Sequence, residues 1–245
     1  MAICSGERVW AVGPPQRCAV LAALVVDADR VVPVDTVVER VWGERPPPHA
    51  RRTLHSHLTR LRRLLEQAGA TVPLPYHSGG YSAGVDPDDV DLHRFDRLVD
   101  RARTCEPADH HRLLLLREAL TVWRGEPFCG VPGAWAERVR EAWRRRHLDA
   151  VVAWSAAELC AGGPDLVIHR LRRLTVDHPT AESAAAVLMR ALATAGRLAE
   201  ALGCYVTVRE RLAEEFGVDP GAELRRAHEE VLRADRRGVV TGPGG

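Results

Sequence analysis

The stretch from Glu44 to Glu66 constrains the fold more than any other, because it joins a regular leucine repeat to a run of basic side chains. Four leucines recur at the spacing of one buried helical stripe, namely Leu54, Leu58, Leu61 and Leu65. No carboxylate lies between the two glutamates, whereas six arginines do. At about 100° per residue, the opposite side holds Arg52, Ser56, Thr59 and Arg63. The pattern predicts one helix with an aliphatic side seated on a core and an arginine–hydroxyl side facing outwards.

The outward side of this helix fits two interpretations. A helix laid into a DNA major groove needs arginine and hydroxyl groups that can contact bases and phosphates. An ordinary solvated helix presents a similar charged side to water. The sequence on either side of the helix therefore has to distinguish between them.

The flanking sequence predicts the remaining parts of a winged helix-turn-helix. Two shorter helices are expected over 16–28 and 34–42, and Gly43 would end the second of them. After the basic helix, apolar residues from 71 to 85 flank a Ser-Gly-Gly turn at 78–80, which is typical of a β-hairpin. In this order the third helix reads DNA and the hairpin is the wing beside the phosphates. A three-helix bundle with an idle hairpin is the alternative.

The second half of the chain reads as helical throughout. Helices are expected over 91–104, 108–123, 134–161, 165–177, 180–195 (with Thr180 as N-cap), 197–216 and 221–236. Gly163 and Gly196 each separate two helices and lie 33 positions apart, close to the period of tetratricopeptide hairpins. We therefore expect a stacked helical array that offers a surface to proteins or peptides, with a plain helical bundle as the alternative.

These elements define the expected fold class and domains. The fold is expected to be mainly α, with a winged helix-turn-helix followed by a tetratricopeptide-like all-α array. The winged helix would occupy 1–86 and the array 91–236, joined by a short polar junction, and 237–245 would form a flexible tail.

Composition excludes several classes of chemistry. All 34 basic residues other than histidine are arginine, so a phosphate-loop lysine, a Schiff-base lysine and a kinase-type lysine are absent. No two cysteines are closer than fourteen residues, so the sequence has no Cys-x-x-Cys metal or redox pattern. We find no catalytic signature and expect no enzyme activity, cofactor or metal site. Without a signal peptide or a membrane-length apolar run, a cytoplasmic, nucleoid-associated protein is expected.

Several short motifs occur in a fixed order across most of positions 13–235. They include Val41-Trp42-Gly43, Thr59-Arg60-Leu61-Arg62-Arg63, Gly79-Gly80-Tyr81, Trp123-Arg124-Gly125-Glu126-Pro127 and Gly217-Val218-Asp219-Pro220. In this order they resemble the Streptomyces antibiotic regulatory proteins of the small type. Members of that family combine an OmpR-type winged helix with a bacterial transcriptional activator domain.

The resemblance implies a transcriptional activator of a secondary-metabolite gene cluster that binds direct repeats in double-stranded DNA. The third helix would enter the major groove, and the wing would contact the minor groove or phosphates. The helical domain would contact RNA polymerase and support a possible homodimer. The implied DNA-binding residues are Arg51, Arg52, Thr53, His55, Ser56, Thr59, Arg60, Arg63, His77 and Tyr81. The alternative function is a helical interaction scaffold whose degenerate winged helix no longer binds DNA.

The sequence departs from the family pattern in two places. Only Met1 to Val12 precede the first helix, where the family usually has a longer β-sheet, and loss of that sheet would expose the back of the helix. The wing holds His77 and Ser82 at places where arginines are common. With fewer fixed positive charges, phosphate contact would weaken and the salt dependence of DNA binding would flatten.

Overall fold

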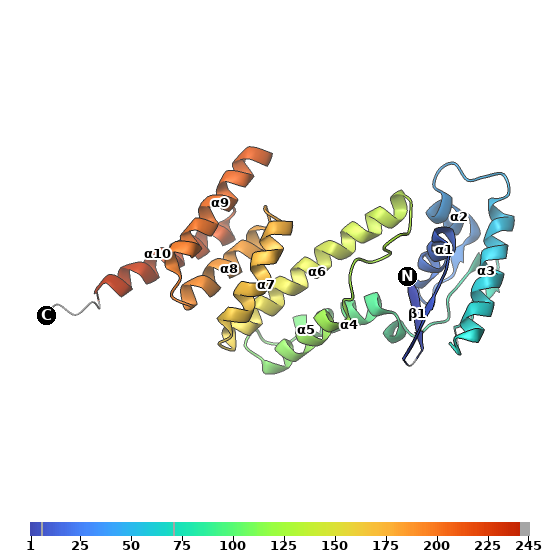
Figure 1. Ribbon diagram of the computed structural model, residues 1–245, viewed down its shortest axis with the longest axis horizontal. Helices are drawn as coiled ribbons and strands as arrows, with labels where there is room; N and C mark the ends of the chain where they lie inside the picture. Colours follow the sequence, from blue (N-terminus) through green and yellow to red (C-terminus); the bar gives the residue numbers. More distant parts are fainter. Residues whose placement is uncertain (6, 71, 241–245) are drawn as a thin grey trace. The chain divides into compact units, whose positions relative to one another are not determined.

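The computed structural model describes residues 1–5, 7–70 and 72–240, with side chains as far as residue 234 apart from that of Ser5. Within these residues there are ten α-helices and five short strands (Figure 1). The chain divides into two compact units. The first comprises Met1–Arg97 and Thr121–Arg146, and the second comprises Leu98–Leu120 and His147–Gly245.

The first unit begins with a β-hairpin and a buried helix. Strands β1 (Ala2–Ser5) and β2 (Arg8–Ala11) pair antiparallel, with Ile3 opposite Trp10. Helix α1 (Pro15–Val25) starts with proline in its first turn, and its seven consecutive residues 18–24 are all buried. The back of this helix is therefore covered. Strands β1 and β2 precede the helix, and the His93 side chain donates a hydrogen bond to the Val25 carbonyl at 2.8 Å.

Helices α1, α2 (Val34–Trp42) and α3 (Ala50–Gln67) pack against one another as a three-helix bundle. Helix α2 contributes three buried valines and ends at Gly43, whose φ of 73° lies in the left-handed region that glycine tolerates. Arg40 of α2 donates to the Ala23 carbonyl at 2.8 Å and to the Asp27 carboxylate at 2.5 Å. These bonds fasten α2 to the carboxyl end of α1.

A three-stranded sheet carries the hairpin that the sequence predicted. Strand β5 (Gly80–Tyr81) lies between β3 (Val32–Pro33) and β4 (Tyr76–His77), and all pairings are antiparallel. The hairpin turns at Ser78 and at Gly79, which has a φ of 91°. A side chain at Gly80 would bring its Cβ to 2.5 Å from the Val32 carbonyl oxygen, so glycine allows β3 and β5 to approach. The expected winged helix-turn-helix is confirmed.

The first unit also contains residues beyond the three helices and the sheet. A short 3₁₀ turn, η1 (Pro87–Asp89), follows the hairpin, and α4 (Asp91–Arg103) begins two residues later. Phe95 is 1% exposed and packs against Trp123 and Trp143, with ring centroids 5.2 and 6.3 Å away. Trp135 lies beneath the Arg40 guanidinium at 5.3 Å. The tryptophans of residues 121–146 thus enlarge the core of the first unit.

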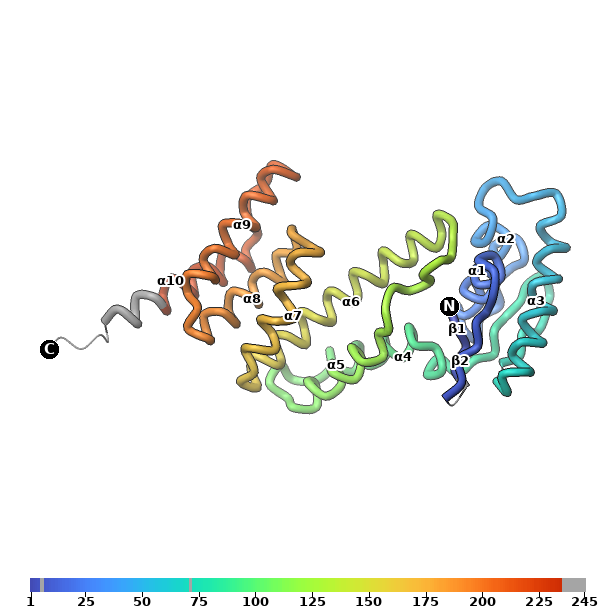
Figure 2. The backbone as a smooth tube through the Cα atoms, viewed as in Figure 1, coloured from blue at the N-terminus to red at the C-terminus, as the bar shows by residue number. Residues whose placement is uncertain are grey.

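Helices make up the described part of the second unit, and Figure 2 traces their succession. They are α5 (His110–Val122), α6 (Ala134–Cys160), α7 (Pro164–Asp177), α8 (Glu182–Thr194), α9 (Leu198–Phe216) and α10 (Ala222–Val240), with α4, α5 and α6 divided between the units. Helix α8 packs against α7, α9 and α10. This arrangement confirms the expected helical array.

Several helix boundaries differ from the expected ones; α1, for example, ends at Val25 rather than at residue 28. The residue that caps the start of α8 is Ala181, so Thr180 is not the N-cap. Helix α10 continues to Val240, four residues beyond its expected end at 236, and residues 241–245 of the expected tail lie outside the described residues. Among the residues that the structure describes, no helix has the length and apolar content needed to span a bilayer.

Candidate nucleic-acid interface

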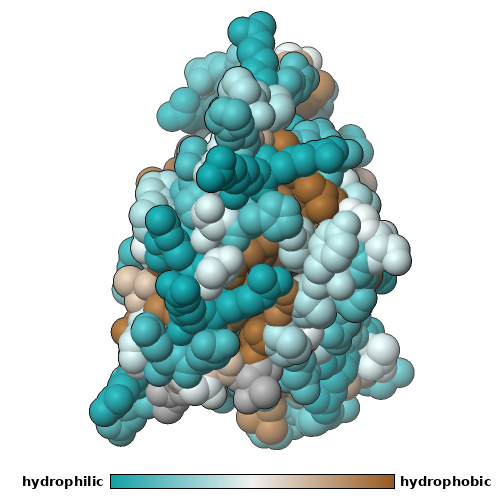
Figure 3. Space-filling model, turned by 90° about the vertical axis from the view of Figure 1, so that its right-hand side faces the viewer, coloured by the Kyte–Doolittle hydropathy of each residue, from teal (hydrophilic) through white to brown (hydrophobic). Residues whose placement is uncertain are grey.

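Helix α3 has the two-sided character that its sequence predicts. The four leucines of its buried side are at most 4% exposed. The opposite side exposes most of the candidate residues, namely Arg51, Arg52, His55, Ser56, Thr59, Arg60 and Arg63, and Thr53 is half-buried. Figure 3 shows the face of the molecule on which α3 lies, where hydrophilic side chains predominate with small apolar areas between them. The structure therefore presents these side chains together on one accessible surface.

The arginines of this surface differ in how they are held. Arg51 donates to the Asp35 carboxylate at 2.6 Å, but both side chains are more than two-thirds exposed. An ion pair of this kind contributes less than about 1 kcal/mol to stability. Arg52, Arg60 and Arg63 have no hydrogen-bond or ion-pair partner within the described part of the chain. These three guanidinium groups remain available to an external ligand.

The hydroxyl groups of α3 all donate to the helix itself. Thr53, Ser56 and Thr59 each donate to the carbonyl four residues earlier, at 3.1, 3.2 and 3.0 Å. Their oxygen lone pairs are thereby left to face outwards.

Tyr81 connects the hairpin to α3. Its hydroxyl lies 2.8 Å from His55 Nδ1, and its ring is 2% exposed against Tyr76 and His55. Burial raises the pKa of the Tyr81 phenol, so the hydroxyl keeps its proton. The protonated hydroxyl can donate to Nδ1, and the imidazole then carries its own proton on Nε2. Tyr81 therefore faces inwards and positions His55, whose second ring nitrogen stays available.

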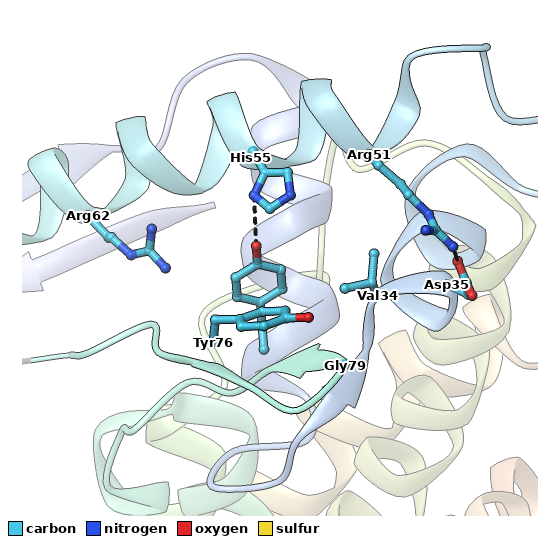
Figure 4. Close-up of a pocket in the computed structure, with 8 residues that line it drawn as sticks. Val34, Asp35, Arg51, His55, Arg62, Tyr76 and Gly79 are labelled. Atoms are coloured by element: carbon cyan, nitrogen blue, oxygen red, sulfur yellow. Dashed lines mark hydrogen bonds and ion pairs between the residues drawn. The ribbon is translucent and has the colours of Figure 1, made fainter.

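A cleft of about 530 Å³ opens between α3, the start of α2 and the hairpin (Figure 4). It is lined by Val34, Asp35, Arg51, His55, Arg62, Tyr76, Gly79 and Tyr81. Arg62 crosses from α3 to the segment before the hairpin and donates to the Leu74 carbonyl. Two guanidinium groups and an imidazole thus surround a cleft that holds one carboxylate, an arrangement suited to an anion.

The two expected wing residues occupy different environments. His77 is exposed, and its Nε2 lies 3.0 Å from the Ser82 hydroxyl. Ser82 is only 7% exposed. The Ser82 side chain is therefore buried within the hairpin. Of these two residues, only His77 can contact a ligand at the surface.

Sequence reasoning missed two residues of α3, one at this surface and one beneath it. Arg62 lines the cleft but was not among the candidates. His57 lies on the leucine side at 8% exposure, and neither ring nitrogen has a hydrogen-bond partner. Burial, followed by the charges of Arg17 and Arg60, lowers the pKa of His57 from 6.5. Its spacing of three from Leu54 was the available signal, since it places His57 on the buried side.

Comparison with known proteins identifies the family. The family model described as "Transcriptional regulatory protein, C terminal" matches residues 12–79, and the "Bacterial transcriptional activator domain" matches residues 90–232. Regulatory protein DnrI of Streptomyces peucetius is 32% identical over 230 residues, which cover 88% of this chain and 83% of DnrI. The chain belongs to the Streptomyces antibiotic regulatory protein family of transcriptional activators.

Longer relatives of this activator share the same two parts. Regulatory protein AfsR of Streptomyces coelicolor is 36% identical over 236 residues, covering 94% of this chain but 23% of AfsR. A solved structure of Mycobacterium tuberculosis EmbR in complex with a low affinity phosphopeptide is 32% identical, with a TM-score of 0.85, and the match covers 95% of this chain and 64% of that one. The activator thus spans less than two-thirds of either relative. Both relatives are regulatory proteins by name.

Proposed function

We propose that this activator binds double-stranded DNA with the outward side of α3 in the major groove and with the β4–β5 hairpin beside the backbone. The observation that carries the proposal is the group of exposed arginines without partners on a helix side that has no carboxylate. Arginine donates in a bidentate manner to guanine and also neutralises phosphates. The leucine seam and the tie from Tyr81 support a rigid presentation of that side.

The cleft beside α3 supports a second part of the same proposal, a backbone phosphate held by Arg51, His55 and Arg62. The Arg51–Asp35 pair is exposed and weak, so Arg51 can exchange the carboxylate for a phosphate at little cost. His55 would contribute its Nε2 proton. A phosphate contact of this kind fixes the position of the protein on DNA without reading its sequence.

The finer functional assignments rest on the family. We infer that the activator binds direct repeats near promoters of a secondary-metabolite gene cluster and that its helical unit contacts RNA polymerase. Homodimer formation on DNA is part of the same inference. We also propose a functional division into residues 1–86 for DNA binding and 91–236 for activation.

Equilibrium binding to promoter DNA of the neighbouring gene cluster tests the proposal. An Arg52→Ala/Arg63→Ala double variant should lose sequence-specific binding. Arg209 and Arg225 are exposed on α9 and α10 with no side-chain partner in the described chain, so an Arg209→Ala/Arg225→Ala variant is the matched control for charge and should bind normally. Loss of a phosphate contact would also reduce the slope of log affinity against log salt by about one for each contact.

One observation favours the alternative function, a scaffold that no longer binds DNA. Residues 76–81 of the hairpin contain no arginine, so the wing offers little charge to the backbone. A scaffold would show weak, sequence-blind binding that is equal for the wild type and both double variants.

A further inference from the structure

The outward hydroxyls of α3 have a defined hydrogen-bonding character. Ser56 donates its proton to the Arg52 carbonyl at 3.2 Å, and Thr59 donates to the His55 carbonyl at 3.0 Å. A hydroxyl has one proton and two lone pairs, so each oxygen is left as an acceptor. Both residues are exposed. The neighbouring guanidinium groups can only donate.

Thr53 bonds in the same way but is half-buried at the margin, and no other hydroxyl, amide or carboxylate side chain is exposed along this side of the helix up to residue 65. The sequence from 45 to 65 contains no aspartate, glutamate, asparagine or glutamine. The acceptor nitrogen of His55 is already engaged by Tyr81. The amide and carboxylate groups that commonly accept from adenine or cytosine are thus missing. Ser56 and Thr59 are left as the acceptors for a base in the groove.

The two hydroxyls are the inner members of a regular row. Arg52, Ser56, Thr59 and Arg63 lie within about 60° of one another around the helix axis at 100° per residue. With a rise of about 1.5 Å per residue, the row extends for about 16 Å. That length corresponds to about five base-pair steps of about 3.4 Å. The row therefore places donors at its ends and acceptors at its centre.

We propose that Ser56 and Thr59 are specificity-determining residues that accept hydrogen bonds from the amino group of an adenine or a cytosine at the centre of the contacted DNA strand. Guanine and thymine present keto oxygens there, and these would face the hydroxyl lone pairs without a proton between them. Arg52 and Arg63 read guanines toward the two ends. The inference rests on the proposed function, because it assigns base preferences to the same helix.

Base analogues without the amino group test the inference directly. The full chain first selects a site from random duplexes. Each central adenine or cytosine, on each strand in turn, is then replaced by purine or 2-pyrimidinone, which lack the amino group. One replacement should weaken wild-type binding by about three- to tenfold, the effect of one hydrogen bond. In Ser56→Ala or Thr59→Val, the replacement at the matching position should have no further effect.

Two variants serve as controls. Thr59→Ser keeps the hydroxyl and should keep the analogue effect. Thr207 on α9 is exposed and donates to the Gly203 carbonyl at 3.0 Å, so Thr207→Val removes an equivalent hydroxyl away from α3 and should behave as wild type.

The outcomes separate this inference from the proposed function. An analogue effect of equal size in the wild type and in both α3 variants would overturn the inference and leave DNA binding in place. If the wild type enriches no sequence, the proposed function itself fails.

Discussion

His57 is the ionisable side chain among the buried residues of α3. It lies beneath the exposed arginine side of the helix with two unpartnered ring nitrogens, and the positive charges of Arg17 and Arg60 act on it. A buried polar group without a partner costs about 1–3 kcal/mol. A protonated ring in this place would add charge repulsion to that cost. Acidification should therefore loosen α3 from its bundle.

Replacing His57 with leucine tests this view of the site. His57→Leu should raise the free energy of unfolding by about 1 kcal/mol near neutral pH, because an apolar side chain suits this position. The folded-state pKa of His57 is lowered, so the wild type loses stability as pH falls from 6.5 toward that lowered pKa. In urea titrations over the same pH range, the free energy of unfolding of the variant should fall less than that of the wild type. A destabilised variant with unchanged pH dependence would contradict the argument.

His147 makes the corresponding prediction for the second unit. Burial, followed by the charges of Arg170 and His178, lowers its pKa from 6.5 to about 4. Because the unfolded state binds the proton more readily, this histidine contributes stability above pH 6.5 that is lost as pH falls toward 4. The contribution at neutral pH is at most about 3 kcal/mol. His147→Gln should remove most of this pH dependence in thermal unfolding between pH 4 and 7, and an unchanged profile would refute the assignment.

At the scale of elements, the position of α3 relative to the hairpin depends on a few polar ties. Tyr81 contacts His55, and Arg62 reaches the Leu74 carbonyl. The strands themselves are only two residues long, so backbone pairing alone offers little rigidity. The hairpin and the basic helix are therefore held together by side-chain hydrogen bonds more than by strand pairing.

Tyr81→Phe isolates the tie from the hairpin to the helix. The ring and its packing remain, while the bond to His55 is lost, so the free energy of unfolding should fall by about 1 kcal/mol. DNA affinity should fall several-fold, because His55 is no longer held with Nε2 toward the cleft. Fluorescence anisotropy on a selected site measures this, with His55→Phe as the paired variant. Equal DNA affinity of Tyr81→Phe and the wild type would show that the hydrogen bond from Tyr81 does not position His55 for binding.

The close approach at Gly80 gives a second prediction at this scale. In Gly80→Ala the new Cβ would lie 2.5 Å from the Val32 carbonyl oxygen, so β3 and β5 must separate. Gly79→Ala meets no atom within 4 Å but must adopt a φ of 91°. Gly80→Ala should therefore cost more than about 2 kcal/mol, and Gly79→Ala about 1 kcal/mol. Thermal unfolding of both variants measures the difference, and the reverse order would contradict the packing at β3.

At the scale of the whole molecule, the spacing of apolar residues predicted where the helices lie better than it predicted which distant segments they contact. The leucine spacing in α3 determined the buried side of that helix, and Gly196 marked the α8–α9 turn. The burial of Phe95 against Trp123 and Trp143 was not predictable. A tryptophan at helical spacing signals burial but does not say which distant segment it meets. The orientation of Tyr81 depended on a contact with His55, 26 positions away, for the same reason.

The partners of those aromatic residues lead to a prediction about a truncated chain. Residues 121–146 belong to the first compact unit, where the Arg40 guanidinium lies over the Trp135 ring and Trp143 packs on Phe95. A fragment of residues 1–90 lacks Phe95 and the three tryptophans of residues 121–146, although it keeps α1 to α3 and the hairpin. It should therefore unfold at a lower temperature than the first unit in the full chain and bind DNA more weakly. Trp135→Ala in the full chain should shift the same transition in the same direction, because it removes the contacts of this ring with Arg40 and Phe128. Full stability of the fragment would mean that residues 121–146 contribute nothing to the winged helix, and the physical unit would then end near the hairpin.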